Sequence, residues 1–185
     1  MSGEKLAGKK AIVSGGSRGI GRGIALTLAA EGADVAFCHY NDDEKASQTV
    51  ADIEALGRKA FAADCDVSST SAIKDFYAAS VNSIGDIDIL VNNAGHNITE
   101  NFEDISEESF DRMLNVHVKG TFFMTQAVYR DMIKRGSGRI INITSQLAYK
   151  GAGELTHYCA AKGANTTFTR ALALECAGTG VLVNA

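Results

Sequence analysis

Tyr158 and Lys162 are the residues of this sequence best suited to moving a proton. On a helix, a spacing of four residues places the phenol and the ammonium on one face. A free tyrosine has a pKa of about 10 and is a poor base at neutral pH, but a nearby ammonium favours the phenolate. Ser145 precedes Tyr158 by 13 residues and is suited to hydrogen-bond a substrate oxygen that gains charge. The three are candidates for general acid/base chemistry, although one such tyrosine–lysine spacing can also arise by chance.

The second motif is a glycine-rich turn, SGGSRGIG, that follows an apolar segment. Glycines let the backbone turn tightly beside a pyrophosphate, and the start of the following helix supplies free N–H groups and partial positive charge. The spacing is G-x-x-x-G-x-G, whereas the common fingerprint is G-x-G-x-x-G. The turn predicts a dinucleotide site, with a purely structural glycine turn as the alternative. Its predicted binding residues are Gly15, Ser17, Arg18, Gly19, Ile20 and Gly21.

The residues after the second predicted strand bear on the choice of cofactor. An acidic residue that binds the adenosine ribose 2′-hydroxyl is expected there, but the sequence has His39, Tyr40 and Asn41 before the first carboxylate, Asp42. Arg18 in the turn is suited to pair with a 2′-phosphate. This combination predicts NADP(H) over NAD(H), with Tyr40 and Asn41 closing the ribose site. In the alternative, Arg18 is solvated and Asp42 turns inward to hold the hydroxyl.

An alternation of strands and helices positions these motifs. Apolar runs of the kind that a parallel sheet buries predict strands at 10–14, 34–39, 59–64, 87–92, 139–144 and 181–184. Helical patterns with capping residues lie near 21–31, 42–56, 70–84, 106–135 and 157–177. The alternation predicts one α/β domain over residues 1–185, a doubly wound parallel sheet of the Rossmann type with helices on both faces. Ligands bind such sheets at the carboxyl ends of the strands, where Ser145 is expected.

Composition excludes several classes of protein. The 185 residues are 45% hydrophobic and 22% charged, as in an ordinary globular domain. No apolar run approaches the roughly 20 residues of a membrane span, and residues 1–10 lack a signal-peptide core, so a cytoplasmic location is expected. The net charge of −4 argues against a nucleic-acid or membrane partner. The four cysteines lie far apart and no residue group has metal-ligand spacing, so no metal is expected.

Taken in order, the motifs resemble the short-chain dehydrogenase/reductase family over essentially the whole chain. The segments that match are the glycine-rich turn, Asp66-Val67, Asn92-Asn93-Ala94-Gly95, Ser145, and the pair Tyr158 and Lys162. The 3-oxoacyl-[acyl-carrier-protein] reductase-like branch, which also includes sugar and alcohol dehydrogenases, looks nearest. The resemblance implies hydride transfer between NADP(H) and a small carbonyl or alcohol substrate, such as a 3-oxoacyl thioester. The alternatives are an NAD-linked sugar or alcohol dehydrogenase and a non-catalytic dinucleotide-binding module.

The resemblance also implies roles for individual residues. Lys162 would hold the nicotinamide ribose, and further cofactor contacts would come from Asn93, Ala94, Gly95, Asp66 and Val67. The family's usual fourth catalytic residue, an asparagine that supports a proton-relay water, aligns with His117. Histidine also holds water and relays protons, so His117 is a catalytic candidate with a structural role as the alternative.

Two expectations concern assembly and the end of the chain. Family members pair two long helices across a two-fold axis, which implies a homo-oligomer, a dimer or a tetramer. The apolar residues expected on the first of those helices are Phe122, Phe123, Met124, Val128 and Met132. Relatives are expected to continue past the sixth strand with a substrate-covering segment that begins at a proline, and this sequence contains no proline. We therefore expect that the sequence is a fragment or a truncated product.

Overall fold

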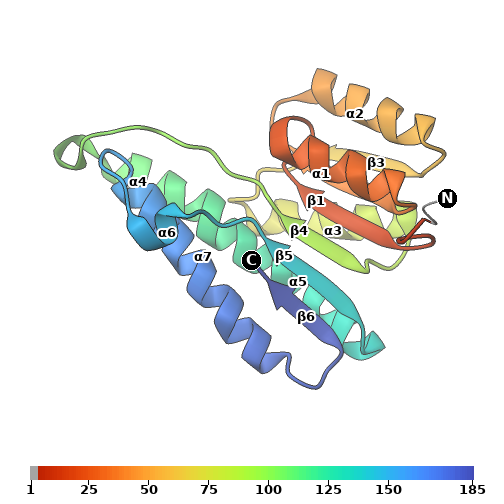
Figure 1. The fold of residues 1–185 in the computed structure, drawn as a ribbon. Coiled ribbons are helices and arrows are strands. Elements are labelled where there is room, and N and C mark those ends of the chain that lie inside the picture. The colour runs from red at the N-terminus through yellow and green to blue at the C-terminus, as the bar shows by residue number, and fades with distance from the viewer. Residues whose placement is uncertain (1–3) are drawn as a thin grey trace.

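The computed structural model describes residues 4–185, which form a layered α/β fold around one parallel sheet (Figure 1). The sheet has the order β3-β2-β1-β4-β5-β6. Its strands are β1 (Lys10–Ser14), β2 (Asp34–His39), β3 (Ala60–Asp64), β4 (Ile89–Asn92), β5 (Gly138–Asn142) and β6 (Val181–Asn184). The strand order reverses between β1 and β4, which opens a crevice at the carboxyl ends of these strands. The predicted doubly wound sheet is confirmed.

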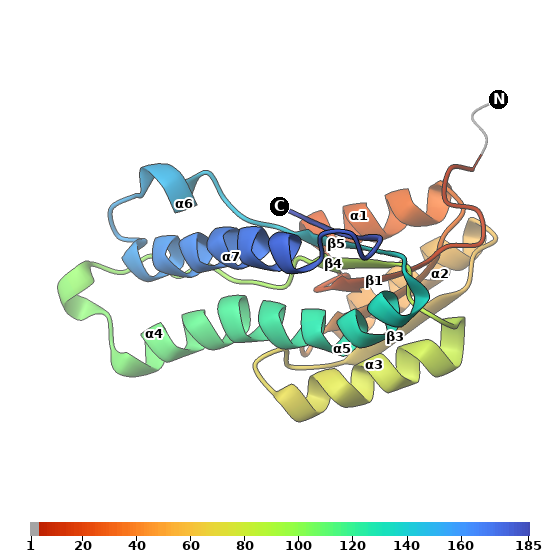
Figure 2. The ribbon, with the colours of Figure 1, turned by 90° about the horizontal axis from the view of Figure 1, so that it is seen from below.

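Helices pack on both faces of the sheet (Figure 2). They are α1 (Gly19–Ala30), α2 (Asp43–Ala55), α3 (Thr70–Ile84), α4 (Glu107–Leu114), α5 (Gly120–Arg135), α6 (Leu147–Lys150) and α7 (Thr156–Glu175). The helices α1 and α2 cover one face, and α3 and α5 cover the other. Within residues 4–185, no helix combines the length and the apolar character needed to cross a membrane.

The central strands are buried on both sides, which explains their nearly continuous apolar sequences. Ile12 and Leu90 belong to a buried cluster with Met124 of α5. The next residue of β1, Val13, belongs to a second cluster with Ala25 of α1. Because successive side chains of a strand point to opposite faces, β1 contributes to both cores. This packing fixes the strand that leads into the glycine-rich turn.

The helix predicted at 106–135 is interrupted, which is the main correction to the predicted elements. Between α4 and α5 lies a five-residue π-helical segment, η2 (Asn115–Lys119), that contains His117. A π-helical segment adds a residue to the turn and rotates the side chains that follow. The short helix α6 and the 3₁₀ turn η1 (Phe102–Asp104) were also not predicted.

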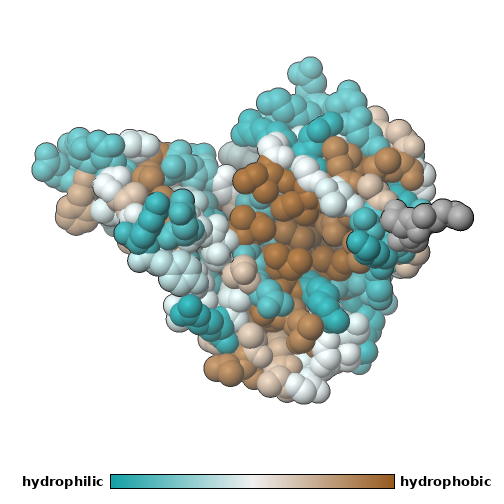
Figure 3. Space-filling view, viewed as in Figure 1, coloured by the Kyte–Doolittle hydropathy of each residue, from teal (hydrophilic) through white to brown (hydrophobic). Residues whose placement is uncertain are grey.

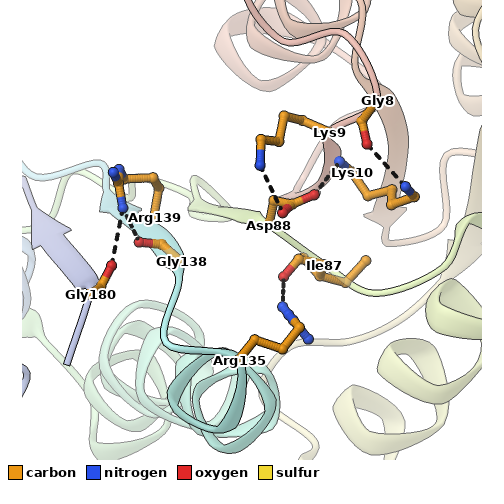
Figure 4. Close-up of polar contacts among 9 residues, drawn as sticks. All are labelled: Gly8, Lys9, Lys10, Ile87, Asp88, Arg135, Gly138, Arg139 and Gly180. Atoms are coloured by element: carbon orange, nitrogen blue, oxygen red, sulfur yellow. Dashed lines mark hydrogen bonds and ion pairs between the residues drawn. The ribbon is translucent and has the colours of Figure 1, made fainter.

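The amino ends of the strands are tied together by polar contacts at the sheet edge opposite the crevice (Figure 4). Asp88 accepts hydrogen bonds from the backbone N–H of Lys10, at 3.0 Å, and from the ammonium of Lys9, at 3.3 Å. Arg135 at the end of α5 donates to the carbonyl oxygen of Ile87. These contacts join the starts of β1 and β4 to α5, at the opposite end of the strands from the crevice.

The outer strands β5 and β6 are covered on one face only. Their residues alternate between buried and exposed, and Ile141 and Leu182 are 38% and 52% exposed. Figure 3 shows apolar residues gathered over the middle of this side of the molecule. The strand β6 lies at an edge of the sheet.

Candidate active site

A cleft of about 1330 Å³ opens at the carboxyl edge of the sheet. It brings together most of the residues that the sequence marked as functional. Those that line it are Gly15, Ser17, Arg18, Gly19, Ile20, Gly21, Tyr40, Asp66, Val67, Asn93, Ala94, Gly95, His117, Tyr158 and Lys162. A single cleft that contains both the glycine-rich turn and the tyrosine–lysine pair is large enough for a dinucleotide together with a small substrate.

Two predicted site residues, Asn41 and Ser145, are not among the residues that line the cleft. Asn41 has a φ of 49°, and its backbone N–H donates to Asp64 Oδ2 at 2.7 Å. The Ser145 hydroxyl accepts a hydrogen bond from the backbone N–H of Leu147 at 3.1 Å, at the start of α6. In this structure both residues therefore shape the loops beside the cleft, and their contacts to a ligand stay predictions.

The glycine-rich turn has the geometry of an anion site. Gly15 and Gly19 have φ values of 69° and 56°, in the left-handed region that glycine adopts at no steric cost. The N-cap residue of α1, Arg18, makes no side-chain capping bond. The first N–H groups of α1 are therefore left for an anion such as a pyrophosphate.

The segment after β4 is hydrogen-bonded to this turn. The Ser14 hydroxyl accepts from the backbone N–H groups of Asn93 and Ala94, both at 3.0 Å. The Asn93 side chain in turn donates to the carbonyl oxygens of Ser14, at 3.0 Å, and Gly15, at 3.2 Å. Asn93 and Ala94 were predicted to line a cofactor; what the structure shows is that the Asn93 side chain fixes the shape of the glycine-rich turn.

Tyr158 and Lys162 lie together on α7, as their spacing predicted. Lys162 is buried and donates from Nζ to the carbonyl oxygen of Ile143 at 2.8 Å. Its Nζ lies 5.7 Å from the centre of the Tyr158 ring. Burial lowers the pKa of Lys162 to about 8. At neutral pH the side chain is therefore still mostly protonated, but it loses its proton far more easily than an exposed lysine. This places a positive charge beside the Tyr158 ring.

His117 links the cleft wall to the tyrosine. Its Nε2 lies 2.7 Å from the carbonyl oxygen of His96, and its ring meets the Tyr158 ring edge-on with the centroids 5.5 Å apart. A Cβ at Gly95 would lie 2.4 Å from His117 Cε1, so the imidazole fills the space that this glycine leaves. Burial, assisted by the charge of Lys162, lowers the pKa of His117 to about 4. The ring is therefore neutral at neutral pH.

We expect the substitution His117→Asn to remove part of the acid sensitivity of the fold. The pKa of His117 is about 4 in the folded chain against an ordinary 6.5, so the unfolded chain binds more protons between these values. The free energy of unfolding of the wild type therefore falls as the pH falls through this window, by up to about 3 kcal/mol. Urea unfolding at pH 7 and pH 4.5 should show a smaller loss in His117→Asn than in the wild type. Equal losses in the two proteins would contradict the assignment.

A carboxylate, Asp42, lines the cleft next to the glycine-rich turn. Its Oδ2 accepts a hydrogen bond from the Ser17 hydroxyl at 2.7 Å and lies 3.7 Å from Arg18 Nε. The hydrogen bond from Ser17 holds the pKa of Asp42 below its ordinary value, and the charges of Lys45 and Arg18 act in the same direction. The inward position of Asp42, which the sequence offered only as an alternative, is the one that the structure shows.

His39, Asp43 and Asp64 form a cluster in which atoms able to bind a metal lie within 4.8 Å of one another. The sequence analysis did not predict this cluster. Asp43 Oδ1 lies 3.7 Å from His39 Nε2, and Asp64 Oδ2 lies 3.8 Å from His39 Nδ1. The two carboxylates thus face opposite nitrogens of the ring. Neither distance is that of a hydrogen bond, and the two carboxylates lie on opposite sides of the ring, whereas the ligands of one metal ion would converge on a single point.

The cleft also reaches α4, which the sequence did not connect with the site. The α4 residues that line it are Glu107, Glu108, Asp111 and Arg112. The helix was predicted from its capping pattern, and charged residues on a helix ordinarily indicate only a solvated face. Their position on the cleft wall depends on the loop between β4 and α4, whose path no local pattern predicts.

Comparison with known proteins gives a consistent result. Residues 9–185 match the family described as short chain dehydrogenase. The chain is 42% identical over 180 residues to 2-dehydro-3-deoxy-D-gluconate 5-dehydrogenase of Bacillus subtilis, covering 97% of this chain and 70% of that protein. It is 37% identical over 177 residues to the 3-oxoacyl-[acyl-carrier-protein] reductase FabG of Staphylococcus epidermidis, covering 96% of this chain and 72% of the relative.

Solved structures agree with these relatives. A short chain dehydrogenase from Burkholderia cenocepacia in complex with NADP superposes with a TM-score of 0.91 at 38% identity, covering 97% of this chain and 73% of the other. An NAD+-bound xylitol dehydrogenase superposes with a TM-score of 0.93 at 35% identity, covering 98% and 70%. Both the sequence match and the superpositions span nearly all of the chain described here. The chain therefore belongs to the short-chain dehydrogenase/reductase family of oxidoreductases.

Proposed function

We propose that this chain binds NADP(H) and reduces a small carbonyl compound, a 3-oxoacyl thioester or a similar ketone, or oxidises the corresponding alcohol. The observation that carries the proposal is that Tyr158 and Lys162 line the same cleft as the glycine-rich turn. A proton-transfer pair and an anion site in one cleft are what hydride transfer to a carbonyl requires. The reductase name of the Staphylococcus epidermidis relative supports the choice of substrate class.

The residues of the turn fit a nicotinamide dinucleotide. Two glycines with positive φ leave the backbone open, the first turn of α1 offers free N–H groups, and Asn93 holds the turn in shape. When bound, the nicotinamide ring would supply the hydride chemistry that the side chains lack. We further propose that Asp66 and Val67 contact the adenine and that Tyr40 closes the ribose site.

In the proposed mechanism Tyr158 is the general acid of reduction and the general base of oxidation. Its phenol gives a proton to the substrate oxygen, or takes one from it, while the Lys162 ammonium stabilises the phenolate. The carbonyl oxygen of Ile143 fixes Lys162 Nζ at 2.8 Å, from where we propose that it also contacts the nicotinamide ribose. Ser145 is proposed to donate its O–H to the substrate oxygen, which its acceptance of the Leu147 N–H leaves possible.

His117 is proposed to support this proton transfer. Its Nδ1 is buried and finds no hydrogen-bond partner among residues 4–185, and we propose that it holds a relay water. Its edge-on contact also fixes the Tyr158 ring. The two contributions are separable because a relay affects the pH dependence of kcat, while positioning affects kcat at every pH.

The direct test is hydride transfer by the purified chain, followed as loss of NADPH absorbance with acetoacetyl-CoA, keto-sugar acids and simple ketones as substrates. Oxidation of NADPH in the presence of at least one of them is expected. Tight NADPH binding without turnover of any substrate would instead indicate a dinucleotide-binding module without catalytic function.

An NAD(H)-linked sugar or alcohol dehydrogenase is the second candidate. The observation that favours it is the inward carboxylate of Asp42, since an acidic group beside the ribose accepts a hydrogen bond from the 2′-hydroxyl. The names of the Bacillus subtilis relative and of the NAD+-bound xylitol dehydrogenase agree with such a substrate.

Replacing Arg18 tests the cofactor proposal. We expect Arg18→Ala to weaken NADPH binding by roughly tenfold or more, because the guanidinium would lose a charge-assisted hydrogen bond to the 2′-phosphate. NADH has no such phosphate, so its affinity should change little. Arg22→Ala is the matched control, since Arg22 lies on the same helix and pairs with Asp52. Fluorescence titration of both cofactors measures the effect, and an equal loss for NADPH and NADH would contradict the proposal.

We also propose that the chain acts as a homo-oligomer, a dimer or a tetramer, through α5 and α7. Of the residues expected to contribute, Met124, Val128 and Met132 are buried in the core of the chain itself. Phe122 is 43% exposed and its ring lies 5.2 Å from that of Phe168 on α7. Sedimentation velocity should show dimers or larger species that Phe122→Asp dissociates. A monomer at micromolar concentration would contradict the proposal.

The proposed site needs no nucleic-acid or membrane partner, since its cleft accounts for a small-molecule substrate. The cytoplasm is the proposed location. All four cysteines are free thiols in the structure, which accords with a reducing compartment.

A further inference from the structure

The helix α7, which carries Tyr158, begins without a capping side chain. Tyr158 is the third residue of α7, and the N-cap residue Leu155 makes no side-chain hydrogen bond. Serine, threonine, aspartate or asparagine ordinarily supplies that bond, and a helix end without one frays easily. The direction of the Tyr158 phenol therefore depends on contacts that reach the start of α7 from other segments.

Glu100, in the segment between β4 and α4, makes two such contacts. Its backbone N–H donates to the carbonyl oxygen of Glu154 at 2.9 Å, and its Oε2 lies 3.4 Å from Nε2 of His157. Glu154 lies just before α7 and has a φ of 59°, a left-handed conformation that is uncommon for a residue other than glycine. The backbone and the side chain of one residue thus hold the chain on both sides of the start of α7.

The carboxylate of Glu100 is itself anchored to α4. The Ser109 hydroxyl donates a hydrogen bond to the same oxygen, Oε2. The start of α4 is well capped, because the Ser106 hydroxyl accepts from the backbone N–H of Ser109 at 3.1 Å. The helices α4 and α7 lie side by side (Figure 2). Glu100 therefore ties the uncapped start of α7 to the capped start of α4.

His157, which directly precedes Tyr158, is the group of α7 that lies against this carboxylate. Its side chain is 1% exposed, against 25% for that of Glu100, and within residues 4–185 neither ring nitrogen makes a hydrogen bond. A buried polar group without a hydrogen-bond partner is unfavourable, and the nearby Glu100 carboxylate offsets part of this cost. Loss of the carboxylate would favour a turn of the imidazole toward water, and Tyr158 is the next residue along the helix.

We propose that Glu100 is a positioning residue for Tyr158, on which it acts by fixing the first turn of α7 through His157 and Glu154. The expected effect on catalysis rests on the proposed acid/base role of Tyr158, whereas the anchoring of α7 does not. Glu100 does not line the cleft, so it acts through α7 and not by contact with a ligand.

Lys162, one turn further along α7, is held separately, since its Nζ donates to the carbonyl oxygen of Ile143 at 2.8 Å. Loss of the Glu100 carboxylate should therefore displace Tyr158 relative to Lys162 instead of moving the two together. A displacement of about 1 Å at a reacting group can cost about 100-fold in rate. None of the contacts described for Glu100 involves the glycine-rich turn, so the affinity for NADPH should change little.

The kinetic experiment compares the wild type with Glu100→Ala and Glu100→Gln in the full chain. The substrate is whichever of acetoacetyl-CoA, the keto-sugar acids and the simple ketones the wild type reduces fastest. We expect Glu100→Ala to lower kcat by about 10- to 100-fold and to change the affinity for NADPH by less than about twofold. Glu100→Gln keeps an oxygen acceptor at the same place, so it should recover kcat to within about threefold of the wild type.

Hydrogen exchange followed by mass spectrometry tests the anchoring without any substrate. The backbone N–H of Cys159 donates to the carbonyl oxygen of Leu155 at 2.8 Å, so its exchange reports the opening of the first turn of α7. The N–H groups of residues 159–162 should exchange about fivefold faster or more in Glu100→Ala, while those of β1 keep the wild-type rate. A role in overall stability alone would speed exchange across the sheet as well.

Two further variants control for indirect effects. Glu103→Ala removes an exposed carboxylate of the same segment that does not line the cleft, and it should leave kcat and exchange within about twofold of the wild type. His157→Phe keeps a ring but removes both nitrogen atoms. In the double variant with Glu100→Ala, the loss of kcat should not exceed the larger of the two single losses, because residues that act through one contact are not additive.

The outcomes separate this inference from the proposed function. If Glu100→Ala keeps the kcat and the exchange of the wild type while Tyr158→Phe loses turnover, the positioning role is overturned and the proposed function stands. If Glu100→Ala speeds exchange throughout the sheet, or if Glu103→Ala gives the same loss, the effect is one of stability or charge and the inference is overturned. If the wild type turns over no substrate, the proposed function fails. The anchoring of α7 is then supported by faster exchange confined to its first turn and overturned by unchanged exchange.

Discussion

The substitution Tyr158→Phe is expected to lower kcat by several orders of magnitude while the affinity for NADPH changes by less than about twofold. Phenylalanine keeps the ring, and with it the edge-on contact to His117, but removes the oxygen that carries the proton. The cleft and the phosphate turn stay intact because the phenol oxygen holds neither of them. Steady-state kinetics with an active substrate and a fluorescence titration with NADPH measure the two quantities separately.

Tyr149→Phe is the matched control. Tyr149 lies on α6, is 69% exposed, and does not line the cleft, so removal of its hydroxyl should leave kcat within about twofold of the wild type. A Tyr158→Phe variant that kept more than about a tenth of kcat would contradict the acid/base role of Tyr158. In that event the proton would have to come from another group on the cleft wall.

The parts of the fold that were predictable are those set by short-range patterns. Strands buried on both faces need apolar residues throughout, so β1 and β2 are recognisable from their composition. The π-helical segment at Asn115–Lys119 was not predictable in this way, because one inserted residue changes the hydrogen bonding of a helix without changing its residue types. That segment nevertheless determines where His117 points, which is why its contact with His96 was not expected from the sequence.

In the candidate site, too, the predictable residues are those placed by a single helix or loop. Tyr158 and Lys162 are brought together by the repeat of a single helix, and the glycines of the turn by a single loop, so both were predictable. The position of Asp42 depends on the left-handed conformation of Asn41 and on its bond to Asp64, a residue of another strand. Sequence spacing contains no information on such a loop path. The sequence therefore predicted that Tyr158 and Lys162 lie together, whereas its prediction of NADP(H) rested on Arg18 and gave the inward position of Asp42 only as an alternative.

The helix α1 offers a test in which one substitution should have opposite effects at two positions. A Cβ at Gly21 would lie 2.0 Å from the carbonyl oxygen of Gly15 and 2.5 Å from Asn93 Nδ2. These two atoms are hydrogen-bonded to each other, which ties the turn to the segment after β4, so neither moves freely. We expect Gly21→Ala to lower the free energy of unfolding by roughly 3 kcal/mol and to abolish measurable NADPH binding, because overpacking next to backbone is poorly accommodated.

Gly23 lies two residues further along the same helix, is exposed, and has no atom within 4 Å of an added Cβ. Gly23→Ala should therefore raise the free energy of unfolding by about 0.5–1 kcal/mol, since alanine loses less backbone entropy in a helix, and should leave NADPH binding unchanged. Urea unfolding and NADPH titration of both variants give the comparison. If Gly21→Ala proved as stable as the wild type and still bound NADPH, the close approach of α1 to the turn would not be what shapes the phosphate site. If Gly21→Ala abolishes NADPH binding while Gly23→Ala does not, the site depends on the absence of a methyl group where α1 approaches the glycine-rich turn.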